Sequence, residues 1–225
     1  KKYRHPVATF DLAGGGTIDL LDESARILDR DGWPVNLLVN SLSDVKKIPV
    51  IPAREVTRTG QTDGVRKLVQ EINGRCFIGA FSAGGFTMNA ILRLRGGVQG
   101  LMDLVDEPTL IHAIIDRSLE GAIEKAKALV DAGVDGLFFG DSSASSSMIS
   151  PEHYREYCQP AYRVFVKTMR SYKPSVKIYQ HCCGNYNPIL EMAADEGADA
   201  LHGLDPSKGM NLQDMRRRIG RKICL

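Results

Sequence analysis

The run Tyr179-Gln-His-Cys-Cys-Gly-Asn185 places an imidazole and a thiol two positions apart, at His181 and Cys183. Because side chains of an extended strand alternate between its two faces, these two groups point the same way and Cys182 points to the other side. A histidine nitrogen and a thiolate are both ligands of tetrahedral zinc sites. Gly184 permits a tight backbone turn over such a site. The spacing leaves two interpretations open: a zinc site, or a buried thiol pair beside a hydrogen-bonded histidine.

Other polar residues follow short apolar runs that are typical of strands. They are Ser82 after the run 75–81, Asp141 and Ser142 after the run 135–140, and His202 or Asp205 around Leu204. In a parallel barrel the carboxyl ends of all strands meet at one face, and active sites form there. These residues, together with His181 and Cys183, are therefore the candidates for chemistry.

The elements that position these residues repeat one unit. The stretch 107–132 is apolar at helical spacing, Gly133 ends it, and a short apolar strand at 135–141 follows. Ser150-Pro151-Glu152 then opens a helix to about Tyr172, with Ser as the N-cap and Pro at the first position. The other predicted elements are strands at 75–81, 176–181 and 200–204, helices at 86–94, 188–196 and 211–219, and a strand that begins at Lys222.

Strands and helices that alternate at this spacing predict parallel strands joined by right-handed crossovers. We predict the α/β class and a TIM-type (β/α)₈ barrel. An open doubly wound sheet would show a G-x-G-x-x-G loop after its first strand, and Gly14-Gly15-Gly16 lacks that spacing. The glycine run is interpreted as a turn between a strand ending at Phe10-Asp11 and a helix at 20–28.

The N-terminal third is less regular. Val35–Val39 and Ile48–Ile51 look like strands, in a hairpin or an excursion at the barrel rim. We expect one domain over residues 1–225, with an irregular part at 1–74 and regular units at 75–225. Residues 75–225 supply about five strands and a closed barrel needs about eight, so the barrel is expected to be incomplete in this chain. The chain also begins at Lys1 without a methionine, which indicates missing terminal segments.

Composition excludes several classes of protein. The 225 residues are 43% hydrophobic and 25% charged, which is typical of a folded globular protein rather than a disordered one. A formal net charge of +2 gives no electrostatic case for nucleic acid or an anionic membrane. The basic residues at 216–222 are interpreted as a solvated helix face. No apolar window predicts a membrane span. The five cysteines, two of them adjacent, favour a reducing compartment, with the cytoplasm as the default.

Six motifs, in order along the chain, resemble one family. They are Gly79–Thr87, Leu104–Pro108, Ala132–Asp141, Ile149–Tyr157 with Gln159-Pro160, His181–Asn185 and Gly197–Leu201. From about residue 75 onward the chain resembles the uroporphyrinogen decarboxylase superfamily, and within it the cobalamin- and coenzyme M-type methyltransferases. The run His181-Cys-Cys-Gly-Asn185 is similar to the His-x-Cys-Gly-Asn of those methyltransferases.

The resemblance implies zinc at His181 and Cys183, with a third cysteine ligand well beyond Leu225, since Cys224 comes too early. It implies an enzyme that moves a methyl group between a small substrate (a methyl ether, a methylated compound or a thiol) and a corrinoid (cobalamin) held by a partner protein. Zinc would lower the pKa of a bound thiol or polarise the oxygen of a methyl ether. A homodimer is left open.

Further residues receive roles as hypotheses. Asp141 is expected to be an additional ligand, an acid/base group or a carboxylate that caps the serine-rich loop. His202 either orients a ligand or is simply a polar strand-end residue. Tyr179, Asn185 and Ser82 are expected to line the pocket and contact the cofactor. Cys76 and Cys158 are expected to be core thiols.

Three alternatives remain open at this stage. A tetrapyrrole decarboxylase would need an N-terminal Arg-Gln-Ala-Gly-Arg type of loop, which is absent from the 225 residues. A non-catalytic barrel would bind a corrinoid or porphyrin without turnover. Redox sensing by the adjacent thiols Cys182 and Cys183 is the third. The sequence does not define the methyl donor, because substrate choice depends on loops rather than on the fold.

Overall fold

The computed structural model describes residues 8–11 and 38–225. Its centre is a five-stranded sheet in which every pairing is parallel and the strand order follows the chain. The strands are β1 (Ala8–Asp11), β2 (Ile78–Ala83), β3 (Gly136–Gly140), β4 (Lys177–His181) and β5 (Ala200–His202). The winding of each strand next to its predecessor is typical of a (β/α)₈ barrel. The predicted α/β class with a parallel sheet is therefore confirmed.

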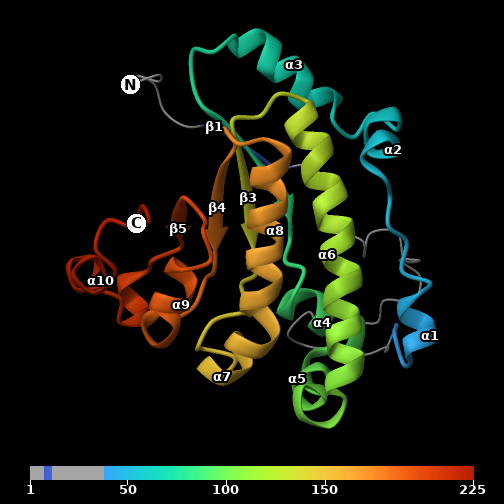
Figure 1. The fold of residues 1–225 in the computed structure, drawn as a ribbon, viewed down its shortest axis with the longest axis vertical. Helices are drawn as coiled ribbons and strands as arrows, with labels where there is room; N and C mark the ends of the chain where they lie inside the picture. Colours follow the sequence, from blue (N-terminus) through green and yellow to red (C-terminus); the bar gives the residue numbers. More distant parts are fainter. Residues whose placement is uncertain (1–7, 12–37) are drawn as a thin grey trace.

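Helices connect and cover these strands, and the long helices α6 and α8 lie in front of the sheet in Figure 1. The α-helices are α1 (Leu42–Val45), α2 (Ala53–Arg58), α3 (Asp63–Ile72), α4 (Met88–Arg95), α5 (Gly97–Asp106), α6 (Pro108–Asp131), α7 (Pro151–His153), α8 (Gln159–Tyr172), α9 (Leu190–Ala194) and α10 (Leu212–Ile219). A π-helix, η3 (Tyr154–Cys158), joins α7 to α8, and short 3₁₀ turns occupy η4 (Asn187–Ile189) and η5 (Pro206–Lys208). None of the described helices is long and apolar enough to span a bilayer.

Helix α6 shows how the apolar pattern builds the core. Its predicted stripe, from Leu110 through Ile111 and Ile114 to Leu119, is buried against the sheet and the neighbouring helices. Full burial of each Leu or Ile side chain contributes about 1.5–3 kcal/mol. Gly133, at a φ of +100°, follows the helix in a conformation that disfavours other residues and turns the chain into β3.

The segment α7–η3–α8 also follows its predicted start. The Ser150 hydroxyl accepts a hydrogen bond from the His153 amide at 3.2 Å, and Pro151 occupies the first helical position. The π-turn is a departure from the predicted continuous helix. It lies where Tyr154 and Cys158 turn inward and are fully buried. Insertions of this kind are common near functional sites.

In the N-terminal third, the predicted strand that ends at Phe10-Asp11 is confirmed as β1, but the prediction at Ile48–Ile51 is wrong. Ile48–Ile51 is not a strand: Pro49 lacks an amide for a ladder, and the Ile48 carbonyl accepts a hydrogen bond from Arg117 of α6 at 2.8 Å instead. In the predicted strand Val35–Val39, the Leu38 and Val39 amides donate to the Leu94 carbonyl rather than to a neighbouring strand. Residues 35–37 lie outside the described residues, as do Gly14-Gly15-Gly16 and the predicted helix at 20–28.

A buried ion pair anchors this segment to the barrel. Arg95 donates to Asp103 at 2.5 Å, and both side chains are at most 8% exposed. The same guanidinium donates to the Val39 carbonyl at 2.7 Å. A buried guanidinium needs such partners, because an unpaired buried charge is strongly destabilising. Arg95 therefore holds the chain at 38–40 against α4 and α5.

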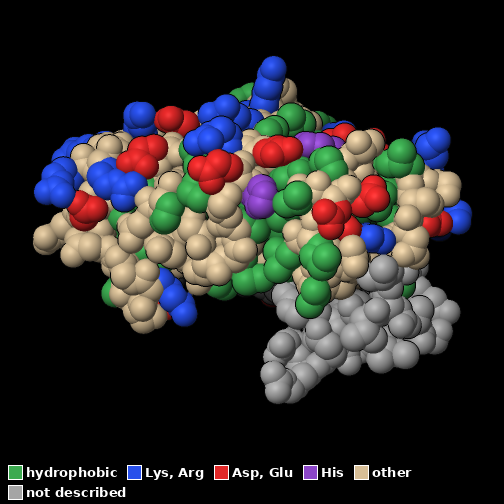
Figure 2. Space-filling model, turned by 90° about the horizontal axis from the view of Figure 1, so that it is seen from below, with side chains coloured by type: hydrophobic (Ala, Val, Ile, Leu, Met, Phe, Trp, Pro, Cys, Tyr) green, Lys and Arg blue, Asp and Glu red, His purple; other side chains and the backbone are tan. Residues whose placement is uncertain are grey.

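The register aligns the strand ends. Gly140 pairs with His181, and His181 pairs with His202, so that three consecutive strands end in one row. Cys224 forms an isolated parallel bridge with Ala200, the first residue of β5, at the opposite end of that strand. The strands in Figure 1 run downward, and Figure 2, seen from below, faces their carboxyl ends. This row of strand ends positions the candidate site.

Candidate active site

The turn that leaves β4 brings the predicted imidazole and thiol together. The Nε2 atom of His181 lies 3.0 Å from the Sγ atom of Cys183. His181 is half-buried and Cys183 is exposed, so both groups can be reached from the carboxyl end of the sheet. Cys182 faces the other way, as predicted: it is buried, and its thiol donates to the Ser142 carbonyl at 3.8 Å. Burial raises the pKa of Cys182 to about 12, which keeps it a neutral thiol.

A second histidine orients the first. The Nδ1 atom of His202, at the end of β5, lies 2.8 Å from the Nδ1 atom of His181. The ring of Phe138 stacks on His181 at 5.5 Å and meets His202 edge-on at 5.2 Å. Burial, and then the neighbouring His202, lower the pKa of His181, which favours its neutral form. A neutral imidazole held through Nδ1 leaves Nε2 as the ligand atom.

Gly203 makes this histidine pair possible. Its φ of +88° lies in the left-handed region, and a Cβ there would come within 2.6 Å of the Cys182 carbonyl and 3.0 Å of the His181 ring. Only glycine fits both the conformation and the close approach. Its role was not predicted from the sequence, because a glycine after an apolar run is also typical of an ordinary turn.

Asp141 lies beside this cluster but does not join it. Its carboxylate accepts hydrogen bonds from the Thr87 hydroxyl at 2.5 Å, the Thr87 amide at 3.0 Å and the Asn89 amide at 2.9 Å. Asp141 is 1% exposed, and burial raises its pKa although these donors oppose the shift. The carboxylate of Asp141 therefore caps the start of α4, whereas the capping role considered from the sequence was on the serine-rich loop.

The remaining predicted pocket residues are dispersed. Ser82 is fully buried and donates to the Phe138 carbonyl at 3.2 Å. Tyr179 lies one layer deeper in the sheet than His181, edge-on to Phe77, and burial raises its pKa to about 12. Asn185 lies in the turn itself, and its amide donates to the Ser147 hydroxyl at 3.1 Å. Of these three, only Asn185 belongs to the segment that carries Cys183.

The His181–Cys183 pair fits part of a zinc site. Bond lengths of about 2.1 and 2.3 Å at a tetrahedral angle would separate nitrogen and sulfur by about 3.6 Å, and a small side-chain adjustment opens the 3.0 Å distance to that value. The described residues contain no cluster of three or more His, Cys, Asp or Glu side chains that could hold a metal. The pair therefore offers two donor atoms, whereas a catalytic zinc site typically has three protein ligands.

An open cavity of about 510 Å³ adjoins the pair. His181, Cys183 and His202 form its polar wall, and the other lining residues are Leu201, Gly203, Leu204, Asp205, Leu212 and Leu225. The leucines make it suitable for a small apolar group. On the face shown in Figure 2, hydrophobic and charged side chains are interspersed, and histidines reach the surface among them.

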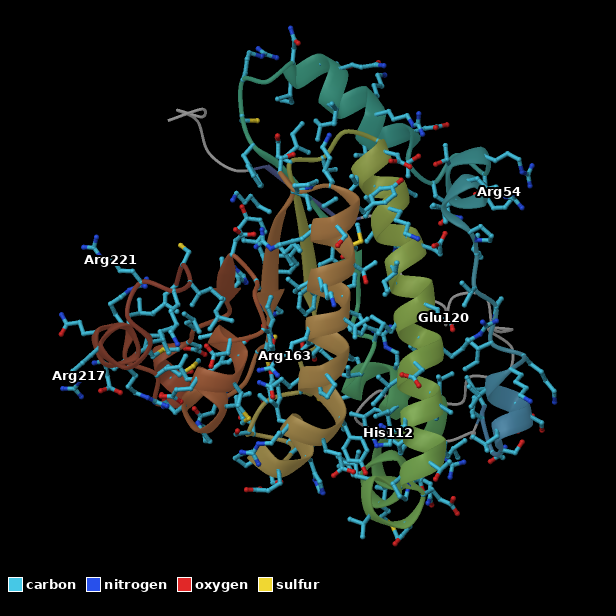
Figure 3. The ribbon with its side chains drawn as sticks, viewed as in Figure 1. Arg54, His112, Glu120, Arg163, Arg217 and Arg221 are labelled. Carbon is cyan, nitrogen blue, oxygen red and sulfur yellow. The ribbon has the colours of Figure 1, made fainter. Side chains whose placement is uncertain are left out.

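A larger cavity of about 630 Å³ lies at the opposite end of β5, between Arg170, Asp199 and Cys224. Of these two cavities, only the smaller is lined by the imidazole–thiol pair, which makes it the candidate site. The prediction of a solvated basic run near the larger cavity holds in part: Arg217 is 81% exposed, and Arg217 and Arg221 project away from the protein in Figure 3. Arg216, in contrast, is half-buried and donates to the Gly220 and Ile223 carbonyls.

Comparisons with known proteins show the family and the fold of this chain. A family model described as "Uroporphyrinogen decarboxylase (URO-D)" matches residues 27–225. A uroporphyrinogen decarboxylase of Pseudoalteromonas translucida is 27% identical over 196 residues, which cover 83% of this chain and 52% of that protein. The chain thus spans about half the length of the curated relatives that it matches over most of its own length.

Methyltransferases match over a shorter range. A methylated-thiol–coenzyme M methyltransferase of Methanosarcina mazei is 34% identical over 95 residues, which cover 42% of this chain and 24% of that protein. A methylcobamide:CoM methyltransferase of Methanosarcina barkeri is 33% identical over 97 residues, or 43% and 27% of the two chains. Among solved structures, a methyltransferase from Methanosarcina mazei superposes with a TM-score of 0.66 at 22% identity, covering 77% of this chain and 50% of that one.

Proposed function

We propose that this chain, which belongs to the uroporphyrinogen decarboxylase family, carries part of the catalytic centre of a zinc-dependent methyltransferase. The enzyme would move a methyl group between a small substrate and a corrinoid on a partner protein. The observation that carries this proposal is the His181–Cys183 pair, whose nitrogen and sulfur lie 3.0 Å apart at the open end of the sheet.

His181, through Nε2, and Cys183, through Sγ, would hold the metal. When bound, zinc would supply Lewis acidity, which activates a thiol or polarises an ether oxygen. His202 would fix the tautomer of His181: with the proton on Nδ1 of His181 donated to Nδ1 of His202, the lone pair of Nε2 points toward Cys183. The short apolar cavity would hold the methyl-bearing substrate.

Other predicted residues would act through position. Asp141 would hold the start of α4 through its bonds to Thr87 and Asn89. Asn185 would hold the turn, while Ser82 and Tyr179 would stiffen the sheet beneath it. The five free cysteines support the proposal that the protein works in the cytoplasm, where thiols stay reduced.

A tetrapyrrole decarboxylase is the second candidate function. It is favoured by the relatives that match over most of this chain, which are named uroporphyrinogen decarboxylases. Decarboxylation by such an enzyme needs no thiolate or metal at His181 and Cys183. The pair would then be a packing feature of the strand end.

An assay of the intact protein separates the two. Purified protein is offered methylcobalamin with a panel of thiols in one experiment, and uroporphyrinogen in another. The methyltransferase proposal expects demethylation of the corrinoid, lost in His181→Ala and Cys183→Ser and retained in Cys224→Ser, an exposed cysteine outside the site. Decarboxylation that survives both site variants would contradict it, and corrinoid binding without turnover would indicate a non-catalytic barrel.

A further inference from the structure

The serine-rich segment between β3 and α7, residues Ser142–Ser147, follows the Cys183–Asn185 turn along its length. We call this segment the serine loop. The Ser142 hydroxyl lies 3.2 Å from the Cys183 sulfur. The Ser146 backbone amide donates to the backbone carbonyl of Asn185 at 3.2 Å, and the backbone amide of Asn185 donates to the Ser147 hydroxyl at 3.1 Å. Both ends of the turn are thus bonded to the same loop.

Between these bonds the two segments pack without space. A Cβ on Gly184 would lie 1.7 Å from the Ser145 hydroxyl oxygen and 2.4 Å from the Ser145 Cβ. Ser145 is fully buried, so it has no room to yield. The glycine is required here by contact with the serine loop, in addition to the tightness of its own turn.

The serine loop is itself fixed. The Ala144 amide donates to the Asp141 carbonyl, and the Ile149 amide to the Ser145 carbonyl, both at 3.0 Å. The Ser143 amide donates to the Asn89 side chain at 3.3 Å. The first two bonds are turns within the connection between β3 and α7, and the third ties the loop to α4. A loop held in this way can act as a template for the turn beside it.

We propose that the serine loop is a preformed template for the metal-binding turn, in which Ser142 holds the sulfur of Cys183 and Ser147 holds the amide of Asn185. The inference rests on the proposed function for the identity of the metal, and Ser142 and Ser147 are positioning residues in it. A thiolate accepts hydrogen bonds and donates none, so in the metal-bound state Ser142 is the donor. Template contacts of this kind strengthen metal binding by about tenfold or more.

The test compares hydroxyl deletions within one loop. Ser142→Ala and Ser147→Ala remove the two template contacts. Ser146→Ala is the matched control, because the Ser146 hydroxyl is buried and has no partner among the described residues, and its amide is kept. Ser142→Thr keeps the hydroxyl. Cobalt(II) binding to the intact protein is followed by its thiolate charge-transfer absorption, and amide hydrogen exchange of residues 183–186 is measured in the metal-free protein.

We expect about tenfold weaker cobalt binding in Ser142→Ala and Ser147→Ala, and binding within about twofold of the original protein in Ser146→Ala and Ser142→Thr. Exchange at 183–186 is expected to accelerate in Ser147→Ala and not in Ser146→Ala. Equal cobalt binding by all four variants would overturn the template. If the unmodified protein binds no cobalt, the proposed function fails, and exchange decides the template alone: acceleration confined to Ser147→Ala supports it, and equal exchange overturns it.

Discussion

The two faces of the β4 end carry similar polar residues and use them differently. On the open face, His181 and Cys183 are accessible, and their nitrogen and sulfur meet at 3.0 Å. On the face toward the helices, Gln180 and Cys182 are at most 3% exposed. The alternation of side chains along a strand therefore separates groups that can meet a ligand from groups that only meet the protein.

The helix-facing side is a sealed hydrogen-bond network. Gln180 donates to the Tyr154 hydroxyl at 3.1 Å, and Tyr154 donates to the Glu196 carboxyl at 2.6 Å. Burial raises the pKa of Glu196 well above its ordinary value, which favours its neutral form. The second carboxyl oxygen of Glu196 and the Gln180 carbonyl oxygen have no partner in the described structure. This buried network contributes to the stability of the fold.

The largest expected difference between the faces is in metal binding. Cys183→Ser is expected to weaken zinc binding by more than about 100-fold, since it removes a ligand. Cys182→Ser is expected to leave zinc binding within about threefold and to lower the free energy of unfolding by about 1–2 kcal/mol, because it buries a hydroxyl. Competition with a chromophoric chelator measures the first effect and urea unfolding the second. Equal loss of zinc binding in both variants would contradict the claim that only the open face of the β4 end binds the metal.

The helix-facing side should dominate stability. Glu196→Ala is expected to lower the free energy of unfolding by about 2–4 kcal/mol, because it leaves Tyr154 and Gln180 buried with fewer partners. Glu191→Ala is the control: Glu191 lies on α9, just before Glu196 in the chain, but is exposed and paired with Arg218 at 2.8 Å, so its loss should cost about 1 kcal/mol or less. Denaturant unfolding of both variants checks this, and similar losses in the two would contradict the network.

The raised pKa of Glu196 predicts a pH dependence of stability. Its folded-state pKa is raised, so its contribution to stability is fully present below the unfolded pKa and is lost as pH rises toward the folded pKa. Relative to Glu196→Gln, which cannot ionise, the original protein should lose up to about 1.4 kcal/mol per pH unit above about pH 4.5. Parallel unfolding curves of the two proteins from pH 5 to 7 would instead show that the carboxyl is not neutral.

The smallest effect is expected at the histidine pair. His202→Ala should weaken zinc binding by about tenfold, because His181 loses the group that fixes its tautomer. His112→Ala is the control, since His112 is half exposed on α6 (Figure 3), next to Glu156, and does not line the cavity. Isothermal titration calorimetry with zinc compares the two variants. Unchanged zinc affinity in His202→Ala would show that His202 is only a polar residue at the strand end and does not orient His181.

Local patterns predicted the regular part of the fold well. The helix from Pro108, the Ser150 cap and the strand to His181 follow apolar periodicity and capping chemistry, which act within a few residues. The segment Ile48–Ile51 was mispredicted because Pro49 has no amide for a strand ladder and the Ile48 carbonyl bonds to Arg117 of α6, far along the chain.

The candidate site was predicted only in part, because local patterns define some of its contacts and not others. Strand alternation placed His181 and Cys183 on one face and Cys182 on the other, which the structure confirms. The burial of Asp141 beneath Thr87, and the contact of the serine loop with Gly184, depend on how two loops meet. No local signal in the sequence carries that information.

Anomalous scattering at the zinc absorption edge, on crystals of the intact protein, tests the central claim most directly. The account predicts one zinc peak within bonding distance of His181 Nε2 and Cys183 Sγ, with at least one further protein ligand and an open position toward the apolar cavity. Crystals of active protein that show no anomalous peak there, or a zinc ion held elsewhere without these two side chains, would contradict it.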